Sequence, residues 1–316
     1  MNIHDSEKIA GMLRQLGYTE CENADQADVV VFNTCCIRET AEKKIYGHIG
    51  QLKKLKRKKP EKIVAVCGCM SQQEGVADII RQKYPFVDII LGTGNLHMLK
   101  DAVVQAQNRK KFVNTDFCVY NEEDFSQYRT SYPNAWVNIN YGCNNFCTYC
   151  IVPYVRGRER SRALEDVLKE VKSLLDEGYK EITLIGQNVN SYGKDLPNNV
   201  TFATLLNEIA KLPGKFRLRF MTSHPKDLTE DIIDAIASCP NICDNVHLPV
   251  QSGSTEILRK MNRHYTREDY LALVEKIRSK IPDVGITTDI MVGFPGETEE
   301  DFCDTLDLVR KAKFSS

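Results

Sequence analysis

Three cysteines near the middle of the chain have a spacing that suits a metal cluster. Cys143, Cys147 and Cys150 form a C-x3-C-x2-C pattern directly after residues 135–140, a run that predicts a strand. Thiolates are the usual protein ligands of iron-sulfur clusters, and a cubane of four irons needs one ligand per iron. Three thiolates leave one iron open, and an open iron can bind a small molecule. The spacing therefore favours a reactive site over a closed structural one.

Other cysteine arrangements explain this spacing less well. A structural zinc site usually shows two C-x2-C pairs, and the bacterial ferredoxin run is C-x2-C-x2-C-x3-C followed by proline. Neither pattern surrounds Cys143. The twelve cysteines of this 316-residue chain also do not resemble the framework of a small disulfide-bonded protein.

The composition is that of a globular protein. The chain has 316 residues, 42% of them hydrophobic, and a net charge of -1, and this length predicts about two domains. No apolar run approaches the roughly 18 residues that cross a bilayer, and the first residues lack the regions of a signal peptide. We therefore expect a cytoplasmic protein without membrane contact, in which only local basic patches could bind nucleic acid.

The N-terminal part of the sequence alternates between helical and strand patterns. The predicted helices are residues 6–16, a segment that ends near residue 58, 71–83 and 96–106, and the predicted strands are residues 28–32, 62–66 and 87–91. Such alternation is typical of a mostly parallel sheet covered by helices. We assign residues 1–107 to a domain built on an open parallel α/β sheet.

Further cysteines follow two of these strands. Cys35 comes after the first predicted strand and Cys69 after the second. Open parallel sheets bind ligands beyond the carboxyl ends of their strands, so the two loops should be neighbours and could share a metal. The alternative is that the loop cysteines only pack against the strand ends; these are Cys35, Cys36, Cys67 and Cys69.

The second half of the chain predicts a different architecture. Residues 108–132 are polar and irregular, which is typical of a linker, and residues 133–316 alternate again. Successive strand–helix units of this length predict a barrel or part of one, with functional residues in the loops after the strands. The predicted strands are residues 136–140, 181–185, 217–221, 245–248 and 286–292, with helical patterns at 163–175 and 267–279 among them.

Several sequence motifs together resemble one known family, the radical S-adenosylmethionine (SAM) methylthiotransferases, and most closely its MiaB type. They cover almost the whole chain, and they are residues 33–39, 66–72, 142–154, 156–162, 248–254 and 293–298. The resemblance implies an N-terminal methylthiotransferase domain, followed by an incomplete radical SAM (β/α)6 partial TIM barrel.

The resemblance also implies two clusters. Cys143, Cys147 and Cys150 would hold a [4Fe-4S] cluster with SAM, and Cys35 and Cys69 match two ligands of an auxiliary [4Fe-4S] cluster. The family's third auxiliary ligand lies in a Gly-Cys-Gln-Met-Asn run, and this chain begins at the Met of that run. The family's barrel continues beyond the end of this chain into a C-terminal TRAM domain. We therefore expect a chain truncated at both ends, with about four irons from its one complete ligand set.

The chemistry implied by the resemblance is radical methylthiolation of tRNA. SAM would yield a 5'-deoxyadenosyl radical, and the substrate carbon would be C2 of an isopentenylated adenosine next to the anticodon. The expected reductant is a flavodoxin or ferredoxin, and the expected state is a monomer. Two alternatives remain: a methylthiotransferase acting on threonylcarbamoyladenosine or a ribosomal-protein aspartate, and an RNA-binding iron-sulfur or zinc protein without catalysis.

Polar and aromatic residues near the strand ends are candidates for SAM contact. In a barrel, the loops after the strands carry such contacts, although loop capping and turn formation explain polar residues there equally well. The candidates are Tyr149, Gln187, Asn188, Ser223 and Gln251.

Four alternating arginines follow the cysteine motif and are candidates for contact with substrate RNA. Guanidinium groups suit phosphate recognition, and a structured RNA offers phosphates together with an unstacked loop base. The four are Arg156, Arg158, Arg160 and Arg162.

Overall fold

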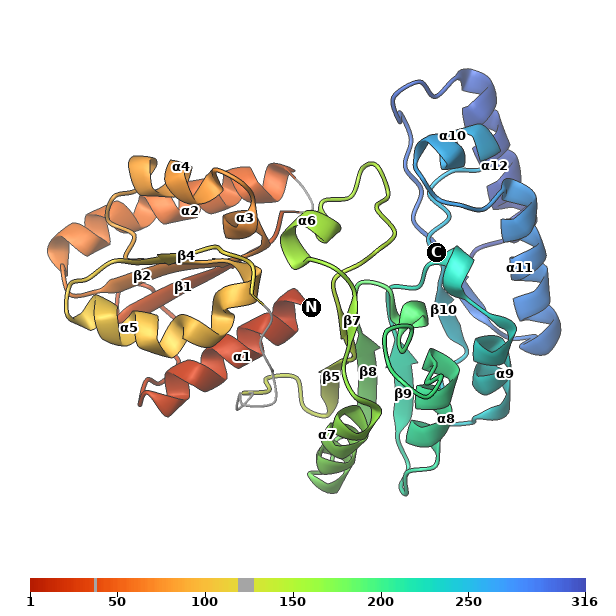
Figure 1. Cartoon of the computed structure of the whole chain (residues 1–316), viewed down its shortest axis with the longest axis horizontal. Coiled ribbons are helices and arrows are strands. Elements are labelled where there is room, and N and C mark those ends of the chain that lie inside the picture. The colour runs from red at the N-terminus through yellow and green to blue at the C-terminus, as the bar shows by residue number, and fades with distance from the viewer. Residues whose placement is uncertain (37–38, 119–127) are drawn as a thin grey trace. The chain divides into compact units, whose positions relative to one another are not determined.

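The computed structural model describes residues 1–36, 39–118 and 128–316, and the chain divides into two compact units. The N-terminal unit comprises Met1–Thr130 and Tyr154–Gly157, and the barrel unit comprises Ser131–Pro153 and Arg158–Ser316. Each unit is described by itself (Figure 1). No helix in the described ranges is both long and apolar enough to cross a membrane.

The N-terminal unit is built on a four-stranded parallel sheet whose strands lie in chain order. Its first two strands run in register from the Val29–Ile63 pair to the Thr34–Gly68 pair. The strands are β1 (Val29–Thr34), β2 (Ile63–Gly68), β3 (Ile89–Leu91) and β4 (Phe112–Asn114).

Helices cover both faces of this sheet (Figure 1). The central strand β2 is entirely buried, and its side chains alternate between two cores. Ile63, Ala65 and Cys67 pack in the core that includes residues of α1 and α5, and Val64 and Val66 pack in the core that includes residues of α2 and α4. The helices are α1 (Asn2–Gln15), α2 (Glu39–Lys58), α3 (Cys69–Gln72), α4 (Val76–Lys83), η1 (Thr93–Met98) and α5 (Leu99–Gln107).

Several predicted bounds shift by a few residues, and two predictions for this unit differ more from the structure. The predicted helix at residues 71–83 is divided into α3 and α4, because Gly75 has a left-handed φ of 73° at the start of α4. The predicted linker at residues 108–132 contains a strand, because Phe112–Asn114 pairs with β3 and extends the sheet. Residues 119–127 of that linker lie outside the described residues.

The barrel unit contains parallel strands, most of them followed by helices, as a partial (β/α) barrel requires. β5 (Asn134–Asn138), β8 (Glu181–Ile185) and β9 (Arg217–Phe220) form one sheet, and β10 (Asn245–His247) pairs with β11 (Gly285–Thr287). A parallel bridge between Leu218 and Ile242 links β9 to the segment before β10. The predicted strand at residues 286–292 is shorter than expected and ends at Thr287.

The outer helices pack against one large core of this unit. Three of them, α8, α11 and α12, begin at threonine capping boxes, which supply hydrogen-bond partners to the first turn. The helices are α7 (Leu164–Asp176), α8 (Phe202–Ala210), α9 (Glu230–Ser238), α10 (Thr255–Lys260), α11 (Arg267–Lys280) and α12 (Glu299–Ala312). Shorter elements are β6 (Asn140–Tyr141), β7 (Arg160–Ser161), η3 (Val189–Ser191) and η4 (Pro225–Asp227), and α6 (Val152–Arg156) begins in this unit and ends in the N-terminal unit.

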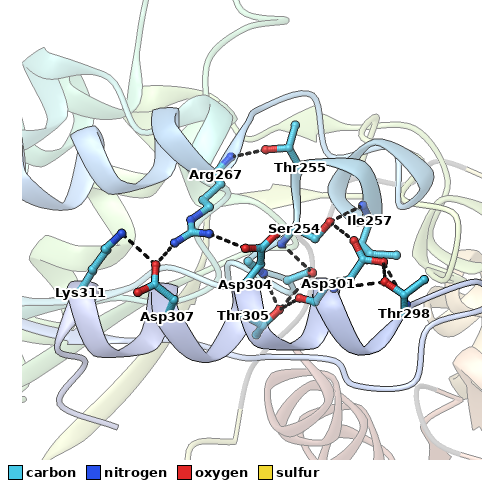
Figure 2. A network of polar contacts seen from close by, with 12 residues as sticks. Ser254, Thr255, Ile257, Arg267, Thr298, Asp301, Asp304, Thr305, Asp307 and Lys311 are labelled. Atoms are coloured by element: carbon cyan, nitrogen blue, oxygen red, sulfur yellow. Dashed lines mark hydrogen bonds and ion pairs between the residues drawn. The ribbon is translucent and has the colours of Figure 1, made fainter.

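A polar network joins α12 to the loop that follows β10 (Figure 2). Thr305 of α12 accepts a 2.8 Å hydrogen bond from the backbone N–H of Gly253, and Ser254 donates to Asp301 at 2.5 Å. The approach is close, because a Cβ on Gly253 would lie 2.4 Å from the Cα of Thr305. Arg267 adds ion pairs to Asp304 and Asp307. The loop after β10 is therefore held by the last helix of the unit.

Candidate metal centres

The cysteine trio Cys143, Cys147 and Cys150 lies in one loop after β6, which we call the cluster loop (residues 142–151). The segment after α10 forms hydrogen bonds to backbone groups of the cluster loop. The Thr148 N–H donates to the carbonyl of Met261 at 3.1 Å. The Asn262 side chain donates to the carbonyl of Phe146 at 3.0 Å.

Each sulfur of the trio has its own N–H donor. Backbone N–H groups of Asn145 and Val152 hydrogen-bond to Cys143 and Cys150 respectively. Arg263 donates to the sulfur of Cys147 at 3.5 Å. Donors of this kind orient and stabilise metal-bound sulfur, so the donor set fits a thiolate-bound cluster.

Burial opposes ionisation of two thiols of the trio, those of Cys143 and Cys150, while no metal is bound. It raises the pKa of Cys143 to about 11, against the opposing effect of the backbone N–H of Asn145. Burial likewise raises the pKa of Cys150. A metal must therefore displace these protons as it binds. Within the described ranges, no three Cys, His, Asp or Glu side chains are close enough to hold a single metal ion.

Buried polar atoms without hydrogen-bond partners lie at the carboxyl ends of β8 and β9. They include Oε1 of Gln187, Oγ of Ser223 and Nε2 of His224. Burial lowers the pKa of His224 to about 3, so its ring is neutral. Buried polar groups normally have partners, and these atoms fit a polar ligand at the strand ends. Among them, Gln187 and Ser223 are SAM-contact candidates from the sequence.

The other SAM-contact candidates have different surroundings. Asn188 is buried and donates to Asp227 at 2.7 Å, while its carbonyl accepts from Asn140 at 2.7 Å, so it joins neighbouring strand ends. Gln251 has a left-handed φ of 70°, a strained conformation that is held by backbone hydrogen bonds to Asp289 and Met291. Asn188 and Gln251 remain candidates for SAM contact.

The loops after β1 and β2 of the N-terminal unit are neighbours, as the parallel arrangement predicts. Gly68 has a φ of 101°, and a Cβ there would lie 2.5 Å from the carbonyl oxygen of Thr34. Cys36 and Cys69 are close enough for a hydrogen bond between their side chains. We call these two loops, with Cys35, Cys36 and Cys69, the auxiliary site.

Arg156 completes the surroundings of Cys69. Its Nε donates to the sulfur of Cys69 at 3.2 Å, and its Nη2 donates to Asp5 at 2.7 Å. The hydrogen bond from Cys36, followed by the charge and hydrogen bond of Arg156, lowers the pKa of Cys69 to about 6, against burial. A thiolate is thus favoured at neutral pH, which suits a metal ligand.

Cys67 has a different character from its neighbour Cys69. It is fully buried in the core that includes residues of α1 and α5, and burial raises its pKa to about 12. Cys67 therefore has the packing role that the sequence left as an alternative.

Comparisons with known proteins give the family. Residues 137–309 match the Radical SAM superfamily, and residues 1–92 match "Uncharacterized protein family UPF0004". A tRNA-2-methylthio-N(6)-dimethylallyladenosine synthase of Clostridium tetani is 58% identical over 100% of this chain and 70% of its own length. The chain belongs to this radical SAM methylthiotransferase family. A synthase of the same name from Caldicellulosiruptor saccharolyticus is 56% identical over 100% of this chain and 68% of its own length.

Solved radical SAM structures confirm the predicted fold of this methylthiotransferase chain. The cobalamin-dependent radical enzyme OxsB aligns with a TM-score of 0.67 at 14% identity, over 97% of this chain and 49% of that one. The methyltransferase TsrM from Kitasatospora setae aligns with a TM-score of 0.65 at 17% identity, over 91% of this chain and 60% of that one. The N-terminal parallel α/β sheet and the partial barrel are thus both as predicted. Membership of the superfamily also implies a cysteine-bound [4Fe-4S] cluster and SAM as cofactors.

The four arginines of the methylthiotransferase motif divide into two groups. Arg156 is paired with Asp5, and Arg162 donates to Glu170 at 2.5 Å and to the carbonyl of Asn138 at 2.8 Å. Both guanidinium groups are nearly buried, so their charge is used within the protein.

The other two arginines pack over aromatic rings near the cluster loop. The guanidinium carbon of exposed Arg158 lies 4.5 Å from the centre of the Phe146 ring, and that of Arg160 lies 5.6 Å from the Tyr141 ring. A stacked guanidinium keeps edges that can still donate hydrogen bonds. Arg158 and Arg160 therefore remain candidates for RNA contact.

Sequence reasoning missed the partners of the cysteines. Arg263 follows the trio by more than a hundred residues, and Asp5 precedes Arg156 by 151 positions. No local spacing joins such pairs, because the contacts arise when distant segments pack together.

Proposed function

We propose that this protein catalyses radical SAM-dependent methylthiolation of tRNA, at C2 of an isopentenylated adenosine next to the anticodon. The observation that carries the proposal is the cysteine trio with one N–H donor for each sulfur. The similarity of the chain to a tRNA-2-methylthio-N(6)-dimethylallyladenosine synthase, at 58% identity, also supports the proposal.

The residues of the barrel unit have defined roles in this proposal. Cys143, Cys147 and Cys150 hold the [4Fe-4S] cluster, and Gln187 and Ser223 offer buried polar atoms to SAM. Tyr149 packs on SAM, while Asn188 and Gln251 keep the strand-end loops in place. When bound, the cluster and SAM supply a 5'-deoxyadenosyl radical, a species able to remove hydrogen from an unactivated C–H bond.

The N-terminal unit has the role of sulfur source. We infer that Cys35 and Cys69 are ligands of an auxiliary [4Fe-4S] cluster, and the low pKa of Cys69, about 6, supports this role. Arg156 holds the Cys69 thiolate in position through its hydrogen bond and its charge.

The proposed methylthiolation of tRNA requires an RNA substrate and a reductant as partners. Arg158 and Arg160 contact substrate RNA, with guanidinium edges directed to phosphate or to an unstacked base. A flavodoxin or ferredoxin reduces the cluster, and the enzyme works as a monomer in the cytoplasm.

Two measurements test the proposal. Anaerobically reconstituted protein with dithionite should convert SAM to 5'-deoxyadenosine, and Cys147→Ala should not. Cys303→Ala, which removes an exposed cysteine on α12, is the matched control and should retain the wild-type rate. SAM cleavage that persists in Cys147→Ala would exclude the trio as the cluster site.

The substrate is tested by mass spectrometry of tRNA nucleosides. Cells that lack the gene should accumulate isopentenyladenosine, and cells that produce the protein should contain its 2-methylthio derivative. A methylthiolated threonylcarbamoyladenosine or ribosomal-protein aspartate in its place would redirect the proposal to that substrate.

A further inference from the structure

Arg263 is a buried cation in direct contact with the cysteine trio. Arg263 is only 4% exposed, and it lies in the segment after α10 that holds the cluster loop. It donates from Nη1 to the sulfur of Cys147 at 3.5 Å, from Nη2 to the carbonyl of Pro249 at 2.8 Å and from Nε to the hydroxyl of Tyr265 at 2.9 Å. Apart from the cysteine, these partners are neutral.

Among the residues that the structure describes, no carboxylate balances the charge of Arg263. Across residues 1–36, 39–118 and 128–316, no Asp or Glu forms an ion pair with this guanidinium. The other inward-facing arginines differ, since Arg156 is paired with Asp5 and Arg162 with Glu170. Burial of a charge is costly unless the charge is paired. The surroundings of Arg263 therefore call for an anion on the side where Cys147 lies.

The cysteine trio can supply that anion when its sulfurs bind metal as thiolates. We propose that Arg263 is a positioning residue that acts as the counter-charge of the trio's iron-sulfur cluster, through its hydrogen bond to the Cys147 sulfur. The inference rests on the proposed function for the presence of that cluster. It adds to that function a residue that sets how easily the cluster is reduced.

The physical reason is electrostatic. Reduction adds an electron to an already anionic cluster, and a nearby positive charge or a hydrogen bond to sulfur stabilises the reduced form. Arg263 supplies both, in a site where burial weakens solvent screening. It also bonds the loop after β10 through Pro249, so one side chain links the cluster loop to a strand end.

The first test is the reduction equilibrium of the cluster in Arg263→Gln. At a fixed solution potential, the ratio of reduced to oxidised cluster, measured by electron paramagnetic resonance, should fall about tenfold, since one charge-assisted hydrogen bond is lost. Both proteins carry Cys69→Ala, which removes the auxiliary site from the spectrum. Arg259→Gln is the matched control, because Arg259 is exposed and its ion pair, among the described residues, is with Glu256; its ratio should equal that of the parent.

The second test needs no change at Arg263. Protein with ¹⁵N-labelled arginine, again in the Cys69→Ala background, should show a ¹⁵N hyperfine coupling in pulsed spectra of the reduced cluster. The hyperfine coupling tests the contact between Arg263 and the cluster even if Arg263→Gln fails to fold. A reduced cluster without such coupling, or a folded Arg263→Gln protein with the parent's ratio, overturns the inference. The proposed function fails separately, if wild-type protein does not cleave SAM.

Discussion

Two buried arginines, one in each unit, donate an N–H to a cysteine sulfur, and they differ in their remaining partners. Arg156 bonds to Cys69 and is paired with Asp5 at 2.7 Å. Within the described part of the chain, Arg263 bonds to Cys147 and otherwise to neutral groups. The first arginine is thus neutralised without any cofactor, whereas the second faces a sulfur that would bind the cluster. The auxiliary site favours a thiolate in advance, because Cys36 and Arg156 lower the pKa of Cys69, whereas burial raises the pKa of Cys143 and Cys150 in the barrel site.

The largest expected effect separates the two sites by activity. Cys147→Ala should abolish SAM cleavage, because the trio would be left with two ligands for the cluster that binds SAM. Cys69→Ala should retain SAM cleavage but lose methylthiolation of tRNA. Chromatography of 5'-deoxyadenosine and mass spectrometry of the modified nucleoside measure the two activities. Equal loss of cleavage in both variants would mean that the two sites do not have separate roles.

The next effect concerns the charge balance at the auxiliary site. Asp5→Asn should lower the free energy of unfolding of the cluster-free protein by about 3 kcal/mol, because it leaves Arg156 buried without its carboxylate. Urea denaturation followed by circular dichroism measures the change. The double variant Asp5→Asn with Arg156→Gln should recover part of the loss. If the single variant is as stable as the wild type, Arg156 is not balanced by Asp5.

A third prediction compares two glycines, one in each unit. Gly253→Ala should destabilise the barrel unit by about 2 kcal/mol, since the added methyl group would overlap Thr305 of α12. It should also raise the KM for SAM through Gln251. Gly47→Ala is the control, because Gly47 lies inside α2 with open space around it; alanine there should stabilise the helix by about 0.5 to 1 kcal/mol. The two substitutions should change the free energy of unfolding in opposite directions. Destabilisation by both would contradict the close contact of Gly253 with Thr305 as the cause.

The smallest effect distinguishes the arginines that follow the trio. Arg158→Ala should weaken tRNA binding severalfold and reduce the salt dependence of log Kd by about one unit of slope, as expected for one lost phosphate contact. Filter binding over a range of salt concentrations measures it. Arg162→Ala should mainly reduce stability, because Arg162 is bonded within the barrel unit to Glu170. An unchanged salt slope in Arg158→Ala would remove Arg158 from the RNA contact.

The sequence predicted the elements that have strong local signals. The strand at residues 181–185 matches β8, and the helix at 267–279 matches α11 within one residue. Short or amphipathic elements were missed, among them β4, α8 and α12. A usable signal existed for α12, since Thr298 and Asp301 form a capping box at its start. None existed for β4, whose three residues become a strand only by pairing with β3.

The sequence alone predicts the chemistry of the cysteine trio, because the three cysteines lie within eight residues and their spacing is local. It also determined which loops face one another, because parallel strands bring their carboxyl ends to one edge. The charge around each sulfur was decided by tertiary structure. Arg263 reaches Cys147, and Arg156 reaches Asp5, across separations of 116 and 151 residues. Burial gives those contacts their strength, and burial depends on how the whole unit packs.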